Sequence, residues 1–283
     1  MPAALTVTRD ATRLEAERFG TDEGPTVLLV AGTSCTRDWW PPALCERIAS
    51  RGIRVIRYDQ RDTGASTTWP VGAPDYGLTD MVADASAILD AVDADRAHII
   101  GFSQGGWVAQ LLALEEPTRV ASLTLVSTRP TEHGPADADL PEVSSELMDA
   151  WSTLAEPDWS NRNEVIDSYV EGERVLAGTD FGKRAVREMC EGAIDRSTDP
   201  RSASNHPMMA PGDRWRERLG QIQAPTTVMH GTMDPLFPVG NAHALATEIP
   251  GAKLRLLEGV GHELPARVWG ELVEVVDQHV QGR

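Results

Sequence analysis

Residues 97–116, AHIIGFSQGGWVAQLLALEE, contain the pattern that decides the fold. The strand-like AHII leads into a glycine-rich turn, and the apolar stretch GWVAQLLALEE that follows is helical in pattern. Gly101 and Gly105 stand two residues before and after Ser103, where a sharp strand-to-helix turn leaves no room for side chains. The order of strand, turn and helix therefore predicts a nucleophile elbow that presents the Ser103 hydroxyl. The stretch has neither the G-x-G-x-x-G of a dinucleotide site nor the lysine of a P-loop.

Strands and helices alternate outward from this turn in both directions. We expect eight strands, at residues 5–8, 13–19, 26–32, 53–59, 97–102, 122–128, 226–231 and 252–258. Apolar residues recur every three or four positions at 78–92, 104–116 and 266–280, which is typical of amphipathic helices. The first two strands form a hairpin, and the later alternation predicts an α/β fold with a mostly parallel sheet flanked by helices.

The alternation stops between about Pro130 and Trp215. Helical patterns occur near 143–155, 161–177 and 180–193, followed by an irregular stretch, and no strand pattern interrupts them. The strand and helix alternation then resumes. We therefore predict a core formed by residues 1–129 and 216–283, with residues 130–215 inserted as a helical cap.

The charge and cysteine content exclude several classes of protein. With 43 acidic and 26 basic residues the formal charge is -17, which repels nucleic acid and anionic membrane surfaces. The N-terminus lacks a secretory pattern and no apolar run is long enough for a membrane helix, so we expect a soluble, cytoplasmic protein. The three cysteines, Cys35, Cys45 and Cys190, are widely spaced and are expected to be free thiols, with no disulfide framework or zinc site.

A nucleophilic serine needs a base, normally an imidazole that a carboxylate orients. On this kind of sheet the acid and then the histidine follow the serine, each on a loop after a later strand. Of the seven histidines, only His262 follows the last expected strand, on a glycine-flanked loop before the final helix. We predict that His262 is the base. The remaining histidines are expected to be surface or core residues: His98, His133, His206, His230, His243 and His279.

Asp234, in GTMDPLFP after the strand at 226–231, is the predicted acid. Some proteins of this kind place the acid one strand earlier, but the chain has no carboxylate there before Glu132. An aspartate before proline is also a common turn residue. Its place in the order before His262 favours the catalytic interpretation.

Acyl transfer also needs hydrogen-bond donors for the oxyanion. We predict that these are the backbone amides of Gln104, directly after the nucleophile, and of Thr33, in the loop after the strand at 26–32. The Gln104 side chain is expected to point towards the cap. Expected contacts with a hydrophobic substrate come from this loop and from the cap: Ser34, Trp39, Trp40, Trp151 and Met208.

Four motifs resemble those of the α/β-hydrolase superfamily: VIRYDQRDTGASTT (55–68), DRAHIIGFSQGG (95–106), APTTVMHGTMDPLFP (224–238) and LLEGVGHELP (256–265). Within the superfamily, the chain is most similar to the aclacinomycin methylesterase group, esterases that act on anthracycline-type aromatic polyketides. The resemblance implies an eight-stranded, mostly parallel sheet with an inserted helical cap.

The resemblance also implies roles for individual residues. It assigns the triad to Ser103, Asp234 and His262, and the oxyanion donors to the Thr33 and Gln104 amides. It implies that the turn after the strand at 53–59 braces the oxyanion loop through Asp59, Arg61, Gly64 and Ser66. The chain departs from the family at Thr33 and Ser34, where glycines are usual, and at Gln104, where an apolar residue is common.

These observations predict a serine hydrolase that cleaves a small-molecule carboxylic ester through an acyl-enzyme, without a metal or organic cofactor. The resemblance suggests a methyl ester of a bulky hydrophobic or polyketide-like compound. The alternatives are a proline iminopeptidase, a cofactor-free haloperoxidase or perhydrolase, and a non-catalytic binding protein. An iminopeptidase would hold the substrate amine with cap carboxylates, for which the sequence offers Glu132, Asp137, Asp139 and Glu142. The intact triad argues against a non-catalytic protein.

Overall fold

The computed structural model describes residues 2–132, 134–210 and 212–282. Its described part contains one eight-stranded sheet with the order β1-β2-β4-β3-β5-β6-β7-β8. β2 is antiparallel to β1 and β4, and every other neighbouring pair is parallel. This confirms the predicted mostly parallel sheet. The strands are β1 (Ala3–Arg9), β2 (Thr12–Phe19), β3 (Thr26–Val30), β4 (Arg54–Tyr58), β5 (Ala97–Phe102), β6 (Val120–Val126), β7 (Thr226–Gly231) and β8 (Lys253–Leu257).

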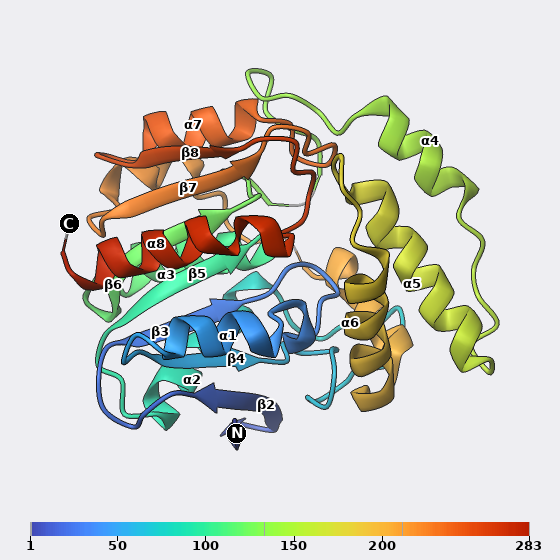
Figure 1. The fold of residues 1–283 in the computed structure, drawn as a ribbon, viewed down its shortest axis with the longest axis horizontal. Coiled ribbons are helices and arrows are strands. Elements are labelled where there is room, and N and C mark those ends of the chain that lie inside the picture. The colour runs from blue at the N-terminus through green and yellow to red at the C-terminus, as the bar shows by residue number, and fades with distance from the viewer. Residues whose placement is uncertain (1, 133, 211, 283) are drawn as a thin grey trace.

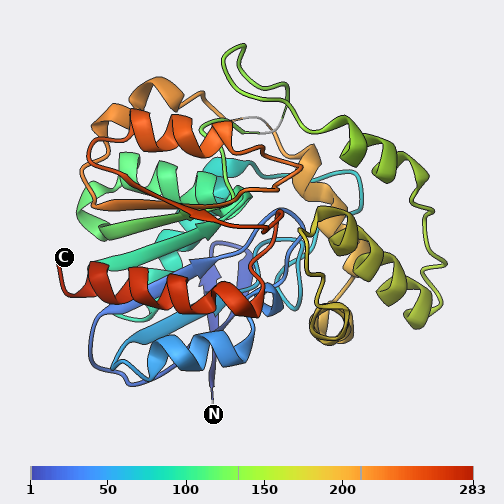
Figure 2. The same ribbon diagram turned by 45° about the horizontal axis from the view of Figure 1, so that its top comes forward.

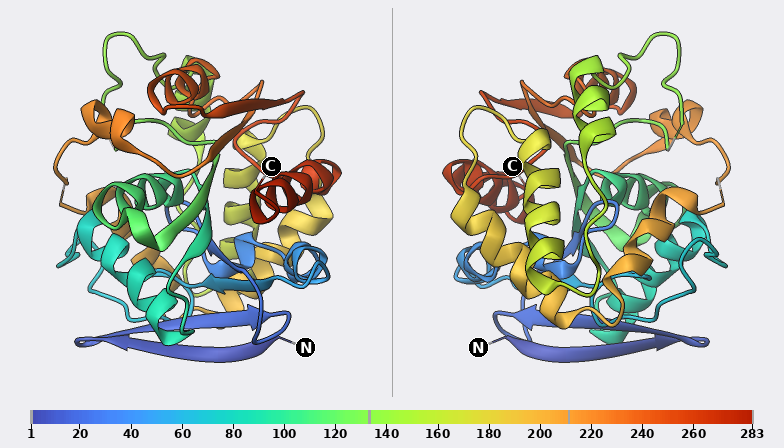
Figure 3. Two further views of the ribbon diagram at one scale, coloured as in Figure 1. Left: turned by 90° about the vertical axis from the view of Figure 1, so that its left-hand side faces the viewer. Right: turned by 90° about the vertical axis from the view of Figure 1, so that its right-hand side faces the viewer.

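Helices cover both faces of the sheet. Figure 3 shows α1 (Pro42–Ala49) and α8 (Trp269–Val280) on one side, and α2 (Leu78–Ala91) and α3 (Gln104–Glu115) on the other. The buried residues of α7 (Gly240–Glu248) belong to the same hydrophobic cluster as those of α2 and α3. Short 3-10 helices complete the core: η1 (Arg37–Trp39), η2 (Pro117–Arg119), η4 (Arg216–Gln221) and η5 (Ala266–Val268).

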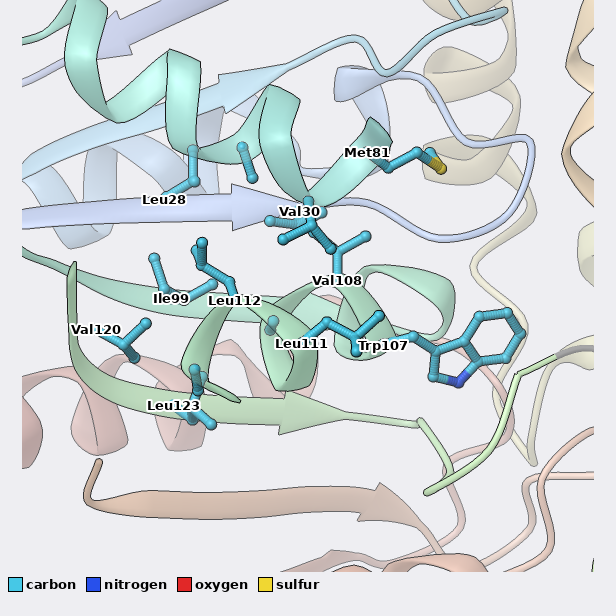
Figure 4. Packing of buried hydrophobic residues seen from close by; sticks show 14 of the residues in the cluster. Leu28, Val30, Met81, Ile99, Trp107, Val108, Leu111, Leu112, Val120 and Leu123 are labelled. Carbon is cyan, nitrogen blue, oxygen red and sulfur yellow. The ribbon is translucent and has the colours of Figure 1, made fainter. Parts of the chain in front are cut away.

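The central strand β3 shows how a strand is buried on both faces of the sheet. All five of its residues are buried. Leu28 and Val30 belong to the cluster on the α2 and α3 side, whereas Val27 and Leu29 belong to the cluster on the α1 and α8 side. Successive side chains of a strand point to opposite faces, so a strand covered on both faces reads as a nearly continuous apolar run, here Val27 to Val30. Figure 4 shows Val108 of α3 beside Val30.

Between β6 and β7 the chain forms a group of helices at one end of the sheet (Figures 1 and 2). They are α4 (Ser145–Thr153), α5 (Arg162–Leu176), α6 (Lys183–Arg196) and the 3-10 helix η3 (Pro200–Met208). The first three correspond to the predicted helical stretches. η3 lies where the sequence predicted irregular structure, and the Asp199 side chain caps it by accepting a hydrogen bond from the Arg201 amide. The division into a core of 1–129 and 216–283 and a cap of 130–215 stays a prediction.

The helices of the described residues are too short or too polar to span a lipid bilayer. The longest, α5, has 15 residues and carries charged side chains. The buried apolar cluster between α5 and α6 is small and consists of Ile166, Val170 and Cys190, with partly buried neighbours around it.

Candidate active site

Ser103 occupies the sharp turn between β5 and α3. Its backbone angles, φ 52° and ψ -120°, lie in a region that non-glycine residues rarely adopt. The Ser103 amide donates to the backbone oxygen of Val126 at 2.9 Å, and the Thr128 hydroxyl donates to the backbone oxygen of Ser103 at 2.7 Å. Such strain costs about 1–3 kcal/mol and persists only where neighbouring structure holds it. Here Val126, at the end of β6, and Thr128, two residues later, hold the strained turn through these hydrogen bonds.

The glycines on either side of Ser103 are required by close backbone contacts. A Cβ atom on Gly101 would lie 2.2 Å from the Gly105 oxygen, and one on Gly105 would lie 2.3 Å from the Val30 oxygen. Both distances are far below van der Waals contact, and the opposing atoms belong to the backbone. The small residues that the pattern predicts are therefore a steric condition of the turn.

Asp234 and His262 meet on neighbouring loops after β7 and β8. The His262 Nδ1 atom lies 2.8 Å from Asp234 Oδ2. The second carboxylate oxygen of Asp234 accepts hydrogen bonds from the amides of Leu236 at 3.0 Å and Phe237 at 2.8 Å. With Asp234 ionised, Nδ1 carries the proton, which leaves Nε2 of the neutral imidazole as a proton acceptor.

Ser103 and His262 line the same cavity, of about 410 Å³, between the sheet and the cap helices. Ser103, His262 and Asp234 are all buried, each residue being 4% exposed. The imidazole ring lies 4.9 Å from the Phe102 ring and 5.3 Å from the Phe237 ring, measured between centroids. The structure therefore brings the three predicted triad residues to one apolar site.

The loop after β3 approaches Ser103 closely. A Cβ atom on Gly32 would lie 3.1 Å from the Ser103 Cβ atom. Thr33 follows, and its amide donates to no acceptor among the residues that the structure describes. Gln104 begins α3, whose N-terminus favours negative charge. These positions suit the predicted oxyanion donors, and that assignment stays a prediction.

The Gln104 side chain, which was expected to point towards the cap, contacts the oxyanion loop and α2. It is fully buried, its Oε1 atom accepts a hydrogen bond from the Thr33 hydroxyl at 3.0 Å, and its Nε2 atom lies 3.2 Å from the Met81 sulfur of α2. The reason is that the first turn of α3 packs inside the core. Gln104 therefore links the oxyanion loop to the helix layer, and its side chain does not line the cavity.

The turn after β4 holds the other side of the oxyanion loop. The Gln60 side chain donates to the backbone oxygens of Ala31 at 3.0 Å and Gly32 at 3.2 Å. Asp59 is fully buried and accepts a hydrogen bond from the Arg37 amide at 2.9 Å. Gly64 has φ +54°, and a Cβ atom there would lie 2.3 Å from the Asp59 carboxylate carbon. These contacts are consistent with the bracing role that the resemblance implies.

His206 fixes the oxyanion loop from the cap side, a role that the sequence did not indicate. Its Nδ1 atom accepts a hydrogen bond from the Ser34 amide at 2.9 Å, and Nε2 lies 2.7 Å from the Arg61 oxygen. Burial lowers its pKa. Since Nδ1 is an acceptor, the imidazole is neutral and donates through Nε2. No local motif surrounds His206, because its partners lie on loops more than a hundred residues earlier in the chain.

The other histidines do not line the active-site cavity in the described part of the chain. His98 pairs with the Ser122 hydroxyl at 2.8 Å. His230 is fully buried, and its Nε2 atom lies 2.6 Å from the Phe237 oxygen. His243 and His279 lie on α7 and α8, as expected. His133 is outside the described residues.

Three of the five expected substrate contacts line a cavity. A second cavity, of about 280 Å³, adjoins the first and shares part of its wall. Trp39 and Trp151 line both, and Ser34 lines the second. Two expectations need correction. Trp40 is fully buried in the core against residues of α1, and Met208 is 55% exposed, so neither lines these cavities.

Two charged residues in the walls were not selected from the sequence. Arg129, three residues after the end of β6, lines the larger cavity, and its guanidinium lies 5.0 Å from the Phe237 ring centre. Burial lowers its pKa. Glu173, in the last turn of α5, lines both cavities. Neither belongs to a recognisable motif, so only the fold reveals them.

Comparisons with known proteins agree with this geometry. The alpha/beta hydrolase fold family matches residues 25–265. Rhodomycin D methylesterase DauP of Streptomyces sp. (strain C5) and DnrP of Streptomyces peucetius are each 30% identical over 297 residues, covering 99% of both chains. The crystal structure of the esterase RhEst1 from Rhodococcus sp. ECU1013 superposes with a TM-score of 0.78 at 23% identity, covering 99% of this chain and 98% of that one. The chain therefore belongs to the α/β-hydrolase family.

Proposed function

We propose that the protein hydrolyses a carboxylic ester, with Ser103 as nucleophile and His262, oriented by Asp234, as base. The observation that carries this proposal is the 2.8 Å contact between His262 Nδ1 and Asp234 in the wall of a cavity that Ser103 also lines. The similarity to two methylesterases over 99% of the chain supports the reaction class.

In the first half of the reaction, His262 Nε2 accepts the Ser103 proton while Oγ attacks the ester carbonyl carbon. The amides of Thr33 and Gln104 donate to the oxygen as it becomes negatively charged. Asp234 stabilises the imidazolium that forms. The tetrahedral intermediate then collapses, and the alcohol leaves with the proton from His262.

In the second half, water enters the position that the alcohol has left. His262 removes a proton from this water, the resulting hydroxide attacks the acyl carbon, and the same two amides hold the oxyanion. Collapse of the second intermediate returns the proton to Ser103 Oγ and releases the carboxylic acid. The cycle consumes only ester and water.

The walls of the cavity favour an ester with a large apolar acyl part. The larger cavity, beside Ser103 and His262, is lined by the apolar side chains of Phe102, Trp39, Leu176 and Phe237. The second cavity extends the space available under the cap. We infer a methyl ester of a bulky hydrophobic compound as the substrate class, which agrees with the methylesterases that the chain resembles. A small alcohol such as methanol leaves the cavity volume to the acyl part.

The four carboxylates that an iminopeptidase would need to hold the substrate amine have other partners in the structure. Asp137 pairs with Arg214 and Arg216, and Asp139 pairs with Arg216. Glu132 accepts a hydrogen bond from the Gly212 amide, and Glu142 accepts one from the Ala136 amide. None of these four carboxylates lines either cavity in the described residues.

A fluorophosphonate probe tests the mechanism directly. The wild-type protein and Ser152→Ala, a control at an exposed serine of α4, should be labelled equally. Ser103→Ala should not be labelled, and His262→Ala should be labelled at least about 100-fold more slowly, because Ser103 then lacks its base. Labelling that persists in Ser103→Ala would refute the proposal. A parallel hydrolysis panel of methyl, short-acyl and long-acyl esters then defines the substrate class.

A further inference from the structure

Glu173 occupies a position in the cap that is tied to the catalytic loop. The end of α5 packs on that loop: the His262 amide donates to the Leu176 oxygen at 2.8 Å, and the Gly178 amide donates to the Glu263 carboxylate at 2.7 Å. Glu173 lies one turn before Leu176 and lines both the triad cavity and the adjoining cavity. Its carboxylate is therefore held where the two spaces meet.

The Glu173 carboxylate has no protein partner among the described residues. No hydrogen bond or ion pair joins it to another residue in the part of the chain that the structure describes, whereas Glu171 on the same helix pairs with Arg174 at 2.5 Å. Burial raises the pKa of Glu173 to about 7, although the nearby His262 acts to lower it. An unpaired carboxylate in an apolar wall is destabilising. A partner supplied by a ligand would remove that cost.

The surroundings of Glu173 favour a cation as that partner. Three aromatic residues, Trp39, Trp151 and Tyr169, line the smaller cavity with it. No lysine or arginine lines this cavity among the described residues. Aromatic faces and a carboxylate together attract an ammonium group, the aromatic faces through their quadrupole and the carboxylate through charge and hydrogen bonds.

The remaining charges direct such a cation away from the larger cavity. Arg129 lines only the larger cavity, and its positive charge repels an amine there. Asp62 also lines the smaller cavity, but its carboxylate already accepts hydrogen bonds from Trp69, Tyr76 and Asn205. Glu173 is therefore the carboxylate available to a ligand.

We propose that Glu173, with Trp39, Trp151 and Tyr169, forms a subsite that binds a protonated amine on the acyl part of the substrate. This assignment rests on ester hydrolysis at Ser103, because it places the amine in the smaller cavity while the ester carbonyl lies at the triad. The enzyme then prefers amino-substituted hydrophobic esters to neutral esters of the same shape.

Two matched esters test the preference. Methyl 6-(aminomethyl)-2-naphthoate carries an ammonium group near neutral pH, and methyl 6-ethyl-2-naphthoate has the same shape without charge. The ratio of kcat/KM for the amino ester to that for the neutral ester should fall about 10- to 100-fold in Glu173→Gln, the range expected for losing a charge-assisted hydrogen bond. Glu171→Gln, the same change at a half-exposed position of α5 that lines neither cavity, should leave the ratio as in wild type. An unchanged ratio in Glu173→Gln would overturn the subsite.

Binding without turnover separates this proposal from the proposed function. Calorimetry with the amino ester and Ser103→Ala should show binding that weakens about 10-fold or more when Glu173→Gln is added. If wild type hydrolyses neither ester but this difference in binding is found, ester hydrolysis fails and the amine subsite stands. If wild type hydrolyses both esters and the double variant binds as tightly as Ser103→Ala, only the subsite fails. Circular dichroism of each variant checks that it is folded.

Discussion

The turn that carries Ser103 and the helix that carries Glu173 line the same cavity, but they are held in different ways. Backbone contacts hold the turn: Gly105 lies against the Val30 oxygen, and the Ser103 amide donates to Val126. Helix α5 is held by a small apolar cluster with α6 and by polar contacts at its end. The core therefore holds the nucleophile in place, whereas the cap supplies a cavity wall whose side chains can change without moving the turn.

The largest expected effect is on the core side, at Asp234. Asp234→Asn keeps the size of the side chain but removes the charge that orients His262 and stabilises the imidazolium. We expect kcat for ester hydrolysis to fall about 10³- to 10⁴-fold with little change in stability. Asp139→Asn, on the surface of the cap, is the matched control and should retain wild-type kcat. A loss below about 10-fold in Asp234→Asn would mean that another group orients the base.

Gly105 offers a steric test of the same region. Gly105→Ala places a methyl group 2.3 Å from the Val30 oxygen, so the elbow must shift. We expect kcat/KM to fall at least about 100-fold and the free energy of unfolding to fall by on the order of 3 kcal/mol. Gly182→Ala in the cap meets no atom within 4 Å and should change neither quantity appreciably. Equal effects of the two changes, by urea unfolding and steady-state kinetics, would remove the distinction between the regions.

His206 tests a contact through which the cap side holds the oxyanion loop. His206→Ala removes the acceptor for the Ser34 amide and loosens the loop that carries Thr33. We expect kcat to fall about 10-fold, equivalent to one lost hydrogen bond, while KM for the ester changes less than twofold. His243→Ala, at an exposed position of α7, is the control. A change in KM alone would show that His206 contributes to substrate binding and not to the oxyanion loop.

The smallest effect concerns the pH dependence of stability. Folding raises the pKa of Glu173 from 4.5 to about 7, so the folded protein binds this proton more tightly than the unfolded chain. The bound proton therefore contributes to the free energy of unfolding. This contribution is complete below pH 4.5 and is lost as the pH rises through about 7. Among the described titratable groups, Cys35, Cys190, His262 and Glu263 interact electrostatically with Glu173.

Glu173→Gln has no carboxylate at this position, so it does not lose this contribution to its stability as the pH rises. Its free energy of unfolding relative to wild type should therefore rise by on the order of 1–3 kcal/mol between about pH 5 and pH 8. Urea unfolding at both pH values measures this difference, with Glu171→Gln as the control. The same difference at both pH values would show that Glu173 is not the group that titrates.

The sequence predicted most of the site because its signals are local. Eight strands, the elbow and the order of Ser103, Asp234 and His262 depend on short runs of residues and on the loops that follow them. Side chains whose partners lie far along the chain were not predicted. The hydrogen bond between the Gln104 and Thr33 side chains was not predicted, and Trp40, expected at the cavity, is buried beside α1. The sequence of the adjacent tryptophans Trp39 and Trp40 does not show which ring lines the cavity and which packs in the core.

Local sequence determined the sheet, the turn at Ser103 and the loops on which the acid and base lie, because glycine spacing and apolar periodicity act over a few residues. Tertiary structure alone decided the surroundings of the catalytic groups. His206 accepts a hydrogen bond from Ser34, far away in the chain. Glu173 lines the cavity because α5 docks on the His262 loop, and it has no hydrogen-bond or ion-pair partner among the described residues. These contacts join segments that are distant in the chain, so their energy depends on how the fold brings surfaces together and leaves no periodic signal in the sequence.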